Sequence, residues 1–121
     1  MTPYITMFVM LVGAHAVGDY ALQSEYIARE KTRDLYVLFI HATIWTFTIA
    51  MTGYLIGLPI NLVHILFILW VPHFVMDYLK AQSKWFPTVV PDPKKQLTID
   101  QAVHYFQLLV LLVVTTQSNL F

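Results

Sequence analysis

Four stretches of about 20 mostly apolar residues divide the chain, and this feature limits its fold more than any other. They run roughly from Tyr4 to Gln23, from Leu35 to Leu58, from Ile60 to Leu79 and from Ile99 to Gln117. An α-helix of that length crosses the hydrocarbon core of a bilayer. The chain is 58% hydrophobic and 12% charged, whereas a soluble domain usually has about 25% charged residues. We therefore predict an all-α, polytopic membrane protein, an antiparallel bundle of four transmembrane helices.

The connections between these stretches are short, so residues 1–121 are predicted to form a single membrane-embedded domain. The first, from Ser24 to Asp34, is a charged loop. The second, from Gly57 to Asn61, is a tight uncharged turn in which Gly and Pro stop the helix. The third, from Lys80 to Thr98, contains three prolines, so no continuous helix is expected there. The first apolar stretch lacks a preceding basic region and is expected to be retained rather than cleaved as a signal peptide.

All seven basic residues lie in or beside the first and third connections. They are Arg29, Lys31, Arg33, Lys80, Lys84, Lys94 and Lys95. Basic loops stay in the cytoplasm, so a multi-pass protein of the inner (plasma) membrane is predicted, with both termini outside the cytoplasm. The formal net charge is zero, which gives no electrostatic case for nucleic acid. The chain has no Cys, which excludes disulfides and thiolate chemistry.

Three His–Asp pairs with i, i+4 spacing lie near the cytoplasmic ends of three of these helices. The pairs are His15 with Asp19, His73 with Asp77, and Asp100 with His104. The order is reversed in the last pair, and so is the direction of its helix. Each histidine therefore lies deeper in the membrane than its aspartate. His41 lies two turns into the second helix, at a similar depth.

Charged groups inside a membrane are costly unless they are paired or hydrated, so they usually face the bundle interior and mark function. Imidazole and carboxylate groups together bind zinc, manganese or iron. We predict a cytoplasm-facing site for a divalent metal ion. Zinc is the favoured metal, and manganese and iron are the alternatives. The candidate ligands are His15, Asp19, His41, His73, Asp77, Asp100 and His104. Seven exceed one tetrahedral zinc site, so either two ions bind or some of the seven orient the ligands.

Five other polar or imino residues receive roles from their positions. Gln23 and Gln101 are expected to orient ligands or to lie at the membrane interface. Lys80 either extends to the headgroups or holds a phosphate of a lipid or small molecule. Pro72 is expected to kink the third helix and to free a carbonyl one turn earlier. His64 lies near the outer end of that helix and is expected to be structural.

The spacing of these motifs resembles a known family. The segments His15-x3-Asp19-x3-Gln23, Lys31 followed by His41, His73-x3-Asp77-x2-Lys80 and Asp100-Gln101-x2-His104 are similar to the bacterial and phage membrane proteins of domain-of-unknown-function family 3307. The resemblance covers most of the chain, from about Phe8 to Leu108. It implies a small membrane protein of unassigned function. The pattern is also loosely similar to that of membrane-bound metal-dependent hydrolases.

Three function classes follow from these features. In the first, a metal-bound water hydrolyses an anionic lipid or a phosphorylated small molecule, with Asp19 or Asp100 as base and Lys80 binding the anion. In the second, the His and Asp residues conduct protons or a divalent cation. The confinement of polar groups to one half of the membrane disfavours this, unless a homo-oligomer completes the path. In the third, the network only fixes helix register and the protein binds a partner.

Overall fold

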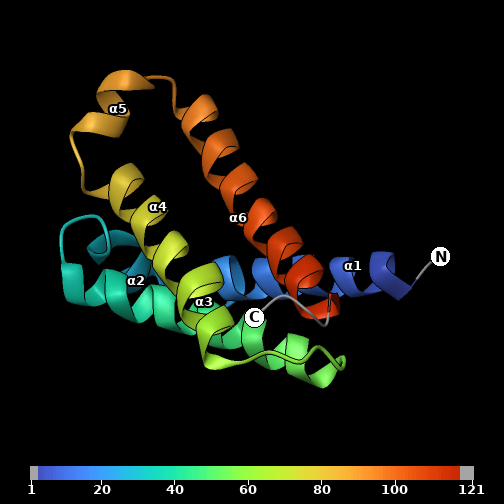
Figure 1. The fold of residues 1–121 in the computed structure, drawn as a ribbon. Coiled ribbons are helices and arrows are strands. Elements are labelled where there is room, and N and C mark those ends of the chain that lie inside the picture. Colours follow the sequence, from blue (N-terminus) through green and yellow to red (C-terminus); the bar gives the residue numbers. More distant parts are fainter. Residues whose placement is uncertain (1–2, 118–121) are drawn as a thin grey trace.

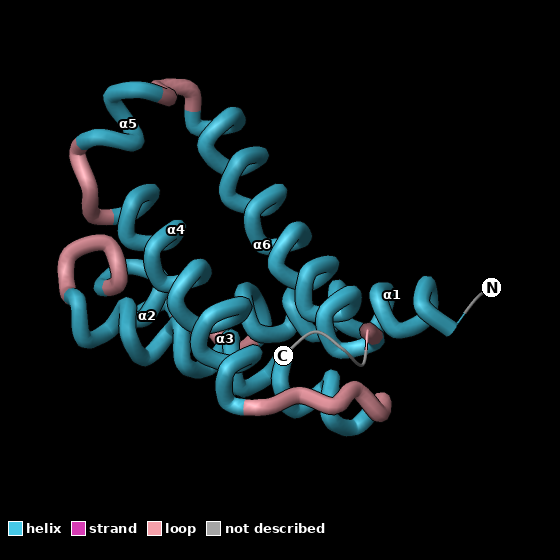
Figure 2. The backbone as a smooth tube through the Cα atoms, viewed as in Figure 1, coloured by secondary structure: helices cyan, strands magenta, loops and turns pink. Residues whose placement is uncertain are grey.

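The computed structural model describes residues 3–117, and within this range it contains helices and loops but no strand (Figure 2). The elements are α1 (Pro3–Ala16), η1 (Val17–Ala21), α2 (Glu25–Glu30), α3 (Leu35–Leu55), η2 (His64–Trp70), α4 (Val71–Ala81), α5 (Trp85–Val89) and α6 (Pro93–Thr116). The elements η1 and η2 are π-helical and continue directly into or from their α-helical neighbours. The predicted all-α class is confirmed.

Caps and turn residues determine where the helices begin and end. The Asp34 carboxylate accepts a hydrogen bond from the backbone N–H of Tyr36 at the start of α3. Asp92 caps α6 in the same way, and Pro93 fills the first turn, where no backbone N–H is needed. Gly57 adopts a φ of 92°, which favours glycine, in the turn after α3.

The structure differs from the sequence prediction at the start of the fourth apolar helix and in the first connection. The fourth apolar helix begins at Pro93 rather than at Ile99, because the Asp92 cap and the proline start it within the polar segment. The charged first connection contains the short helix α2, which Ser24 caps by accepting from the backbone N–H of Ile27. The third connection is interrupted as predicted, but it includes the short helix α5.

The long helices pack as one bundle. Helix α1 contacts α3 and α6, while η2 and α4 contact both α3 and α6. Figure 1 shows α2 and α5 at one end of the bundle and the turn after α3 at the other. The seven basic residues therefore lie at or near the end that carries α2 and α5.

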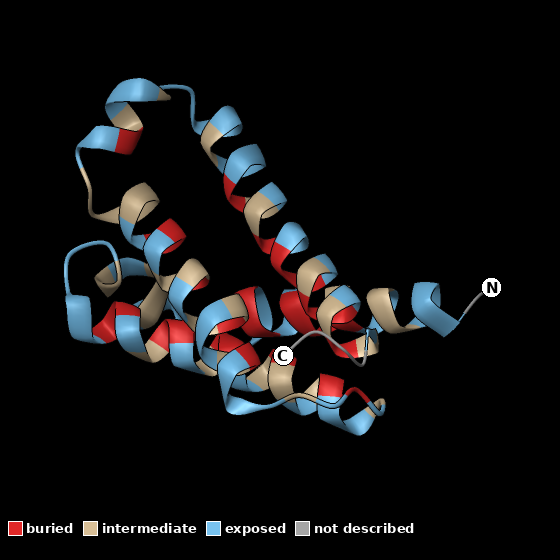
Figure 3. Ribbon diagram, viewed as in Figure 1, coloured by how far each residue is buried: buried red, intermediate tan, exposed pale blue. Residues whose placement is uncertain are grey.

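Many large apolar side chains are exposed, while several ionisable side chains are buried; Figure 3 marks the buried and exposed residues along the helices. Large apolar side chains face outward along the helices; Phe47, Phe67 and Phe106 are each more than 60% exposed. The buried set includes four histidines and three aspartates of the predicted site. A separate apolar core, which contains Leu11, Ile49 and Leu111, fills the other part of the interior. An apolar exterior around a polar interior is the arrangement expected when lipid is the solvent.

Three helical stretches are long and apolar enough to cross a membrane: Pro3–Ala21, Leu35–Leu55 and Pro93–Thr116. The helix formed by η2 and α4 is not among them, so the sequence prediction of four spans is confirmed for three. This helix carries His64, His73, Asp77 and Lys80, whose polarity lowers its mean hydropathy.

Candidate metal centre

Six of the seven predicted ligands meet in the interior, and four helical segments supply them. Asp19 comes from η1, His41 from α3, His73 and Asp77 from α4, and Asp100 and His104 from α6. All six are at most 8% exposed. Within the part of the chain that the structure describes, their ligand atoms form two groups with the spacing of a metal site. Asp77 belongs to both groups.

The first group, Asp19, His41, His73 and Asp77, has the proportions of a tetrahedral site. The Nε2 atoms of His41 and His73 lie 3.3 Å apart. Asp77 Oδ2 lies 3.0 Å from the first of these nitrogens and 3.1 Å from the second. Asp19 Oδ1 lies 3.2 Å from His41 Nε2 and 4.0 Å from His73 Nε2. Ligands about 2 Å from a tetrahedral zinc lie roughly 3.3 Å from one another, so five distances that span 3.0–4.0 Å fit an ion of that kind.

The second group consists of Asp77, Asp100 and His104. His104 Nε2 lies 3.0 Å from Asp100 Oδ1 and 3.6 Å from Asp77 Oδ1. The two oxygens of Asp77 therefore face different groups, with Oδ2 toward His41 and His73. The other oxygen of Asp100 accepts a hydrogen bond from the Lys80 ammonium at 2.9 Å.

Several of these contacts lack the direction of a hydrogen bond. Asp77 Oδ2, Asp100 Oδ1 and His104 Nε2 are buried, and none of the three has a hydrogen-bond partner within the described residues. A buried polar atom without a partner typically costs about 1–3 kcal/mol. A cation coordinated by these lone pairs would satisfy all three. The buried His/Asp cluster thus has both the composition and the spacing to bind a metal ion.

His15, the seventh predicted ligand, lies beside the cluster but outside both groups. Its Nδ1 accepts a hydrogen bond from the Trp45 indole at 2.9 Å. In the neutral ring Nε2 then carries the proton and donates to Gln101 Oε1 at 2.8 Å. The Gln101 amide in turn donates to Asp100 Oδ2 at 3.2 Å. His15 and Gln101 thus form a chain of hydrogen bonds that ends on a carboxylate of the cluster.

Gln107 is a residue of the site that the sequence analysis missed. Its buried amide nitrogen donates to the carbonyls of Ile68 and Leu69, and its Oε1 lies 2.8 Å from His104 Nδ1. Pro72 has no N–H to donate to the Ile68 carbonyl, and the Gln107 amide donates to that carbonyl. With its nitrogen committed to carbonyls, Gln107 presents oxygen to His104. His104 Nδ1 donates to this oxygen and also lies 3.2 Å from His73 Nδ1. In a neutral ring with this donor, the Nε2 lone pair would face the cluster.

Trp45 is a second residue of the site that the sequence analysis missed. Its fully buried ring stacks on His73, with centroids 4.1 Å apart and planes 15° apart. A Cβ on Gly18 would lie 3.2 Å from both Cα and Cδ1 of Trp45, so the glycine allows η1 to approach α3 closely. The spacing offered a signal for both missed residues: Trp45 follows His41 by four residues, and Gln107 follows His104 by three.

A cavity of about 140 Å³ adjoins the cluster on the side of the basic residues. Its lining comprises Asp19, Tyr20, Gln23, Lys31, Asp77, Lys80, Leu97, Asp100 and Gln101. Three cluster carboxylates thus meet two lysines and two amides around one small space. Gln23 and Gln101 both line this cavity, and Gln101 also donates to Asp100. Among the described residues, Lys31 forms no ion pair, whereas Lys80 is paired with Asp100.

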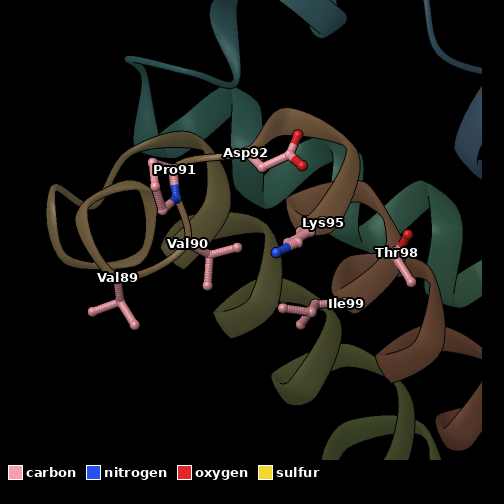
Figure 4. A pocket seen from close by; sticks show the side chains of 7 residues that line it. All are labelled: Val89, Val90, Pro91, Asp92, Lys95, Thr98 and Ile99. Atoms are coloured by element: carbon pink, nitrogen blue, oxygen red, sulfur yellow. The ribbon is translucent and has the colours of Figure 1, made fainter.

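A hollow beside α5 and the residue His64 both lie outside the cluster. A larger hollow of about 400 Å³ adjoins α5 and the start of α6 (Figure 4). It is lined largely by Val, Pro and Ile side chains, and Asp92 in its wall already caps α6. His64 is also outside both groups; its backbone N–H donates to Asn61 Oδ1, and its Nδ1 accepts from the Asn61 backbone N–H. These local bonds agree with the structural role predicted for His64.

The first basic connection carries a well-formed ion-pair cluster. Arg33 donates to both carboxylate oxygens of Glu30, at 2.6 and 2.9 Å, and Arg29 donates at 3.2 Å. Hydrogen bonds from Arg33 and then Arg29 lower the pKa of Glu30 to about 2. The same pairing raises the pKa of Arg33.

The chain belongs to a family described as a protein of unknown function (DUF3307), whose profile matches residues 7–121. This confirms the resemblance found from the His, Asp and Gln motifs. Searches of curated proteins and of solved structures gave no match.

Proposed function

Because membership of this family assigns no activity, we propose a function from the geometry: the protein is a membrane-embedded, metal-dependent hydrolase that acts on a phosphorylated or otherwise anionic substrate. The observation that carries the proposal is the group of Asp19, His41, His73 and Asp77, which has tetrahedral proportions and adjoins a cavity with two lysines. A buried metal next to a cationic pocket is suited to polarising an anionic ester. Zinc is the first choice of metal, and manganese and iron are the alternatives.

The proposal includes four transmembrane segments, the fourth formed by η2 and α4. That stretch packs against α3 and α6, and its outer surface is apolar, with Phe67 67% and Val75 46% exposed. His73 and Asp77 face inward, where the other helices surround them. Basic residues in the loops at α2 and α5 favour the cytoplasm for that end, which would place the cavity mouth there and both termini outside.

Asp19 is best placed to act as the general base. Its side chain is 10% exposed, compared with 4% for Asp77 and 3% for Asp100, and it lines the cavity. Its Oδ1 faces His41, while Oδ2 lies 4.0 Å from His15 Nε2. An ion held by His41, His73 and Asp77 would keep a fourth position, beside Asp19, for a water of lowered pKa. Asp19 would take a proton as that water attacks phosphorus, and it would return the proton to the alcohol oxygen when the P–O ester bond breaks.

Lys31 and Lys80 favour an anionic substrate. Both line the cavity, and Lys80 also neutralises Asp100 through the 2.9 Å hydrogen bond. Lys31 is the cation left to bind a substrate oxygen. An anionic lipid headgroup and a soluble phosphomonoester share this chemistry, so they must be distinguished by assay.

Transport has less support than hydrolysis. A proton or cation would also have to pass the apolar core that contains Leu11, Ile49 and Leu111, which disfavours conduction.

The test is phosphate release by the detergent-purified full chain, after chelation and after addition of Zn²⁺, Mn²⁺ or Fe²⁺. Soluble phosphomonoesters and phosphatidate micelles serve as separate substrate panels. We expect metal-dependent release that Asp19→Asn abolishes while metal remains bound. Metal binding without release from either panel would refute the hydrolase proposal and leave a metal-binding protein. A tag between α5 and α6 that reacts from outside intact cells would refute the proposed orientation.

A further inference from the structure

The carboxylate of Asp77 lies between two sets of buried ligands. Its Oδ2 lies 3.0 Å from His41 Nε2 and 3.1 Å from His73 Nε2. Its Oδ1 lies 3.6 Å from His104 Nε2. A carboxylate that offers one oxygen to each of two ligand sets can bridge two ions, and paired metals in hydrolytic sites lie about 3.5–4 Å apart.

Geometry on the α6 side also points to a ligand rather than to an internal ion pair. Asp100 Oδ1 and His104 Nε2 lie 3.0 Å apart but are not hydrogen-bonded, and both residues are at most 2% exposed. His104 Nδ1 lies 2.8 Å from Gln107 Oε1, to which it donates, and 3.2 Å from His73 Nδ1. In the neutral ring, His104 Nε2 and Asp100 Oδ1 would then both present lone pairs, and two facing lone pairs repel unless a cation lies between them.

We infer that Asp77 bridges two divalent cations, the second of which is held by Asp100 and His104. The inference rests on the proposed function, because the first ion is the one that His41, His73 and Asp77 would hold beside Asp19. It deepens that function by assigning the α6 residues to a second ion and by specifying the charge of the substrate.

The charge balance links the second cation to an anionic substrate. With neutral histidines, three carboxylates and the Lys80 ammonium leave an excess of two negative charges in the cluster. One divalent ion neutralises this excess. A second leaves two positive charges, which are costly in a buried site unless an anion accompanies them. A phosphate dianion in the cavity beside Lys31 has the required charge. The second cation and phosphate should therefore bind together.

The experiment counts Mn²⁺ ions on the chelator-treated full chain in detergent, with and without inorganic phosphate. Equilibrium dialysis with elemental analysis gives the number of ions per chain. Electron paramagnetic resonance distinguishes an exchange-coupled pair of Mn²⁺ ions from isolated Mn²⁺. With phosphate, we expect two ions per chain and an exchange-coupled spectrum. Without phosphate, we expect the affinity for the second ion to fall at least tenfold.

Two variants assign the second ion. His104→Gln should bind one ion with an uncoupled spectrum, and His64→Gln, which changes a buried histidine outside both groups, should bind two. If His104→Gln does not elute as the wild type does on gel filtration, Asp100→Asn takes its place with the same expected result. One ion per wild-type chain, or two uncoupled ions, would overturn the bridge but leave the first site standing. No bound ion would overturn the proposed function itself.

Discussion

Replacing Gln107 with Met should weaken metal binding although residue 107 is not a proposed ligand. Methionine nearly matches glutamine in length and fills the buried space, but it cannot hydrogen-bond to His104 or to the carbonyls of Ile68 and Leu69. His104 would then be free to carry its proton on Nε2, the atom that faces Asp77 and Asp100. A protonated Nε2 cannot bind a cation.

The expected losses of metal affinity and of stability in Gln107→Met follow from the contacts that are lost. Removing a group that orients a metal ligand typically costs about 10–100-fold in metal affinity, which is roughly 1.4–2.7 kcal/mol. The three lost hydrogen bonds should also lower the free energy of unfolding. At about 0.6 kcal/mol per hydrogen bond inside a membrane, the loss is roughly 2 kcal/mol.

The assay is Mn²⁺ titration of Gln107→Met in detergent with phosphate present. The binding phase that His104→Gln abolishes should weaken about 10–100-fold, while the other phase changes less. Thr115→Val is the matched control, because it removes a buried hydroxyl from α6 that bonds only to nearby carbonyls of the same helix. Unchanged affinity in a folded Gln107→Met variant would refute the tautomer argument.

Three further predictions concern packing, charge and substrate. Gly18→Ala should destabilise the protein by about 1–3 kcal/mol, because its Cβ would press on the α3 backbone at 3.2 Å. A Cβ on Gly13 would have no neighbour within 4 Å. Gly13→Ala should therefore raise the free energy of unfolding by up to about 1 kcal/mol, measured by thermal unfolding. The pKa of Glu30 is lowered to about 2. Its ion pairs should therefore stabilise the loop fully above about pH 4.5 and lose this effect as the pH falls toward 2. In Arg33→Ala, an NMR titration should show a higher titration midpoint for Glu30. Lys31→Met should weaken inhibition by inorganic phosphate about tenfold.

Each of these has a contrary outcome. Equal melting temperatures for the two alanine variants would show that the close approach of η1 and α3 does not limit stability. An unmoved Glu30 midpoint in Arg33→Ala would mean that Arg33 is not what holds the carboxylate ionised. Unchanged phosphate inhibition in Lys31→Met would place the anion elsewhere than in the cavity.

The residue pattern predicted the site better than it predicted the backbone. The i, i+4 pairs His73 with Asp77 and Asp100 with His104 converge because each pair lies on one face of a regular α-helix. His15 and Asp19 have the same spacing, but Asp19 lies in the π-helical η1, whose wider turn changes the direction of the side chains that follow. The local sequence of this segment gives no sign of that turn.

Tertiary contacts account for the residues that the sequence analysis missed. Trp45 looks like a lipid-facing aromatic until α1 and α4 are packed against α3, where its ring meets His15 and His73. Gln107 acquires its role from the Ile68 carbonyl on another helix. The packing of η2 against α6 brings the Gln107 amide to this carbonyl, which the sequence alone does not show.

The central claim is that the buried His/Asp cluster binds a metal ion, and its most direct test is the metal content of the full chain purified in detergent from metal-replete cells. Elemental analysis should find at least one equivalent of a transition metal per wild-type chain. A His73→Ala, Asp77→Ala double variant that elutes as the wild type does should contain none. A folded wild-type protein without bound metal under these conditions would contradict the account.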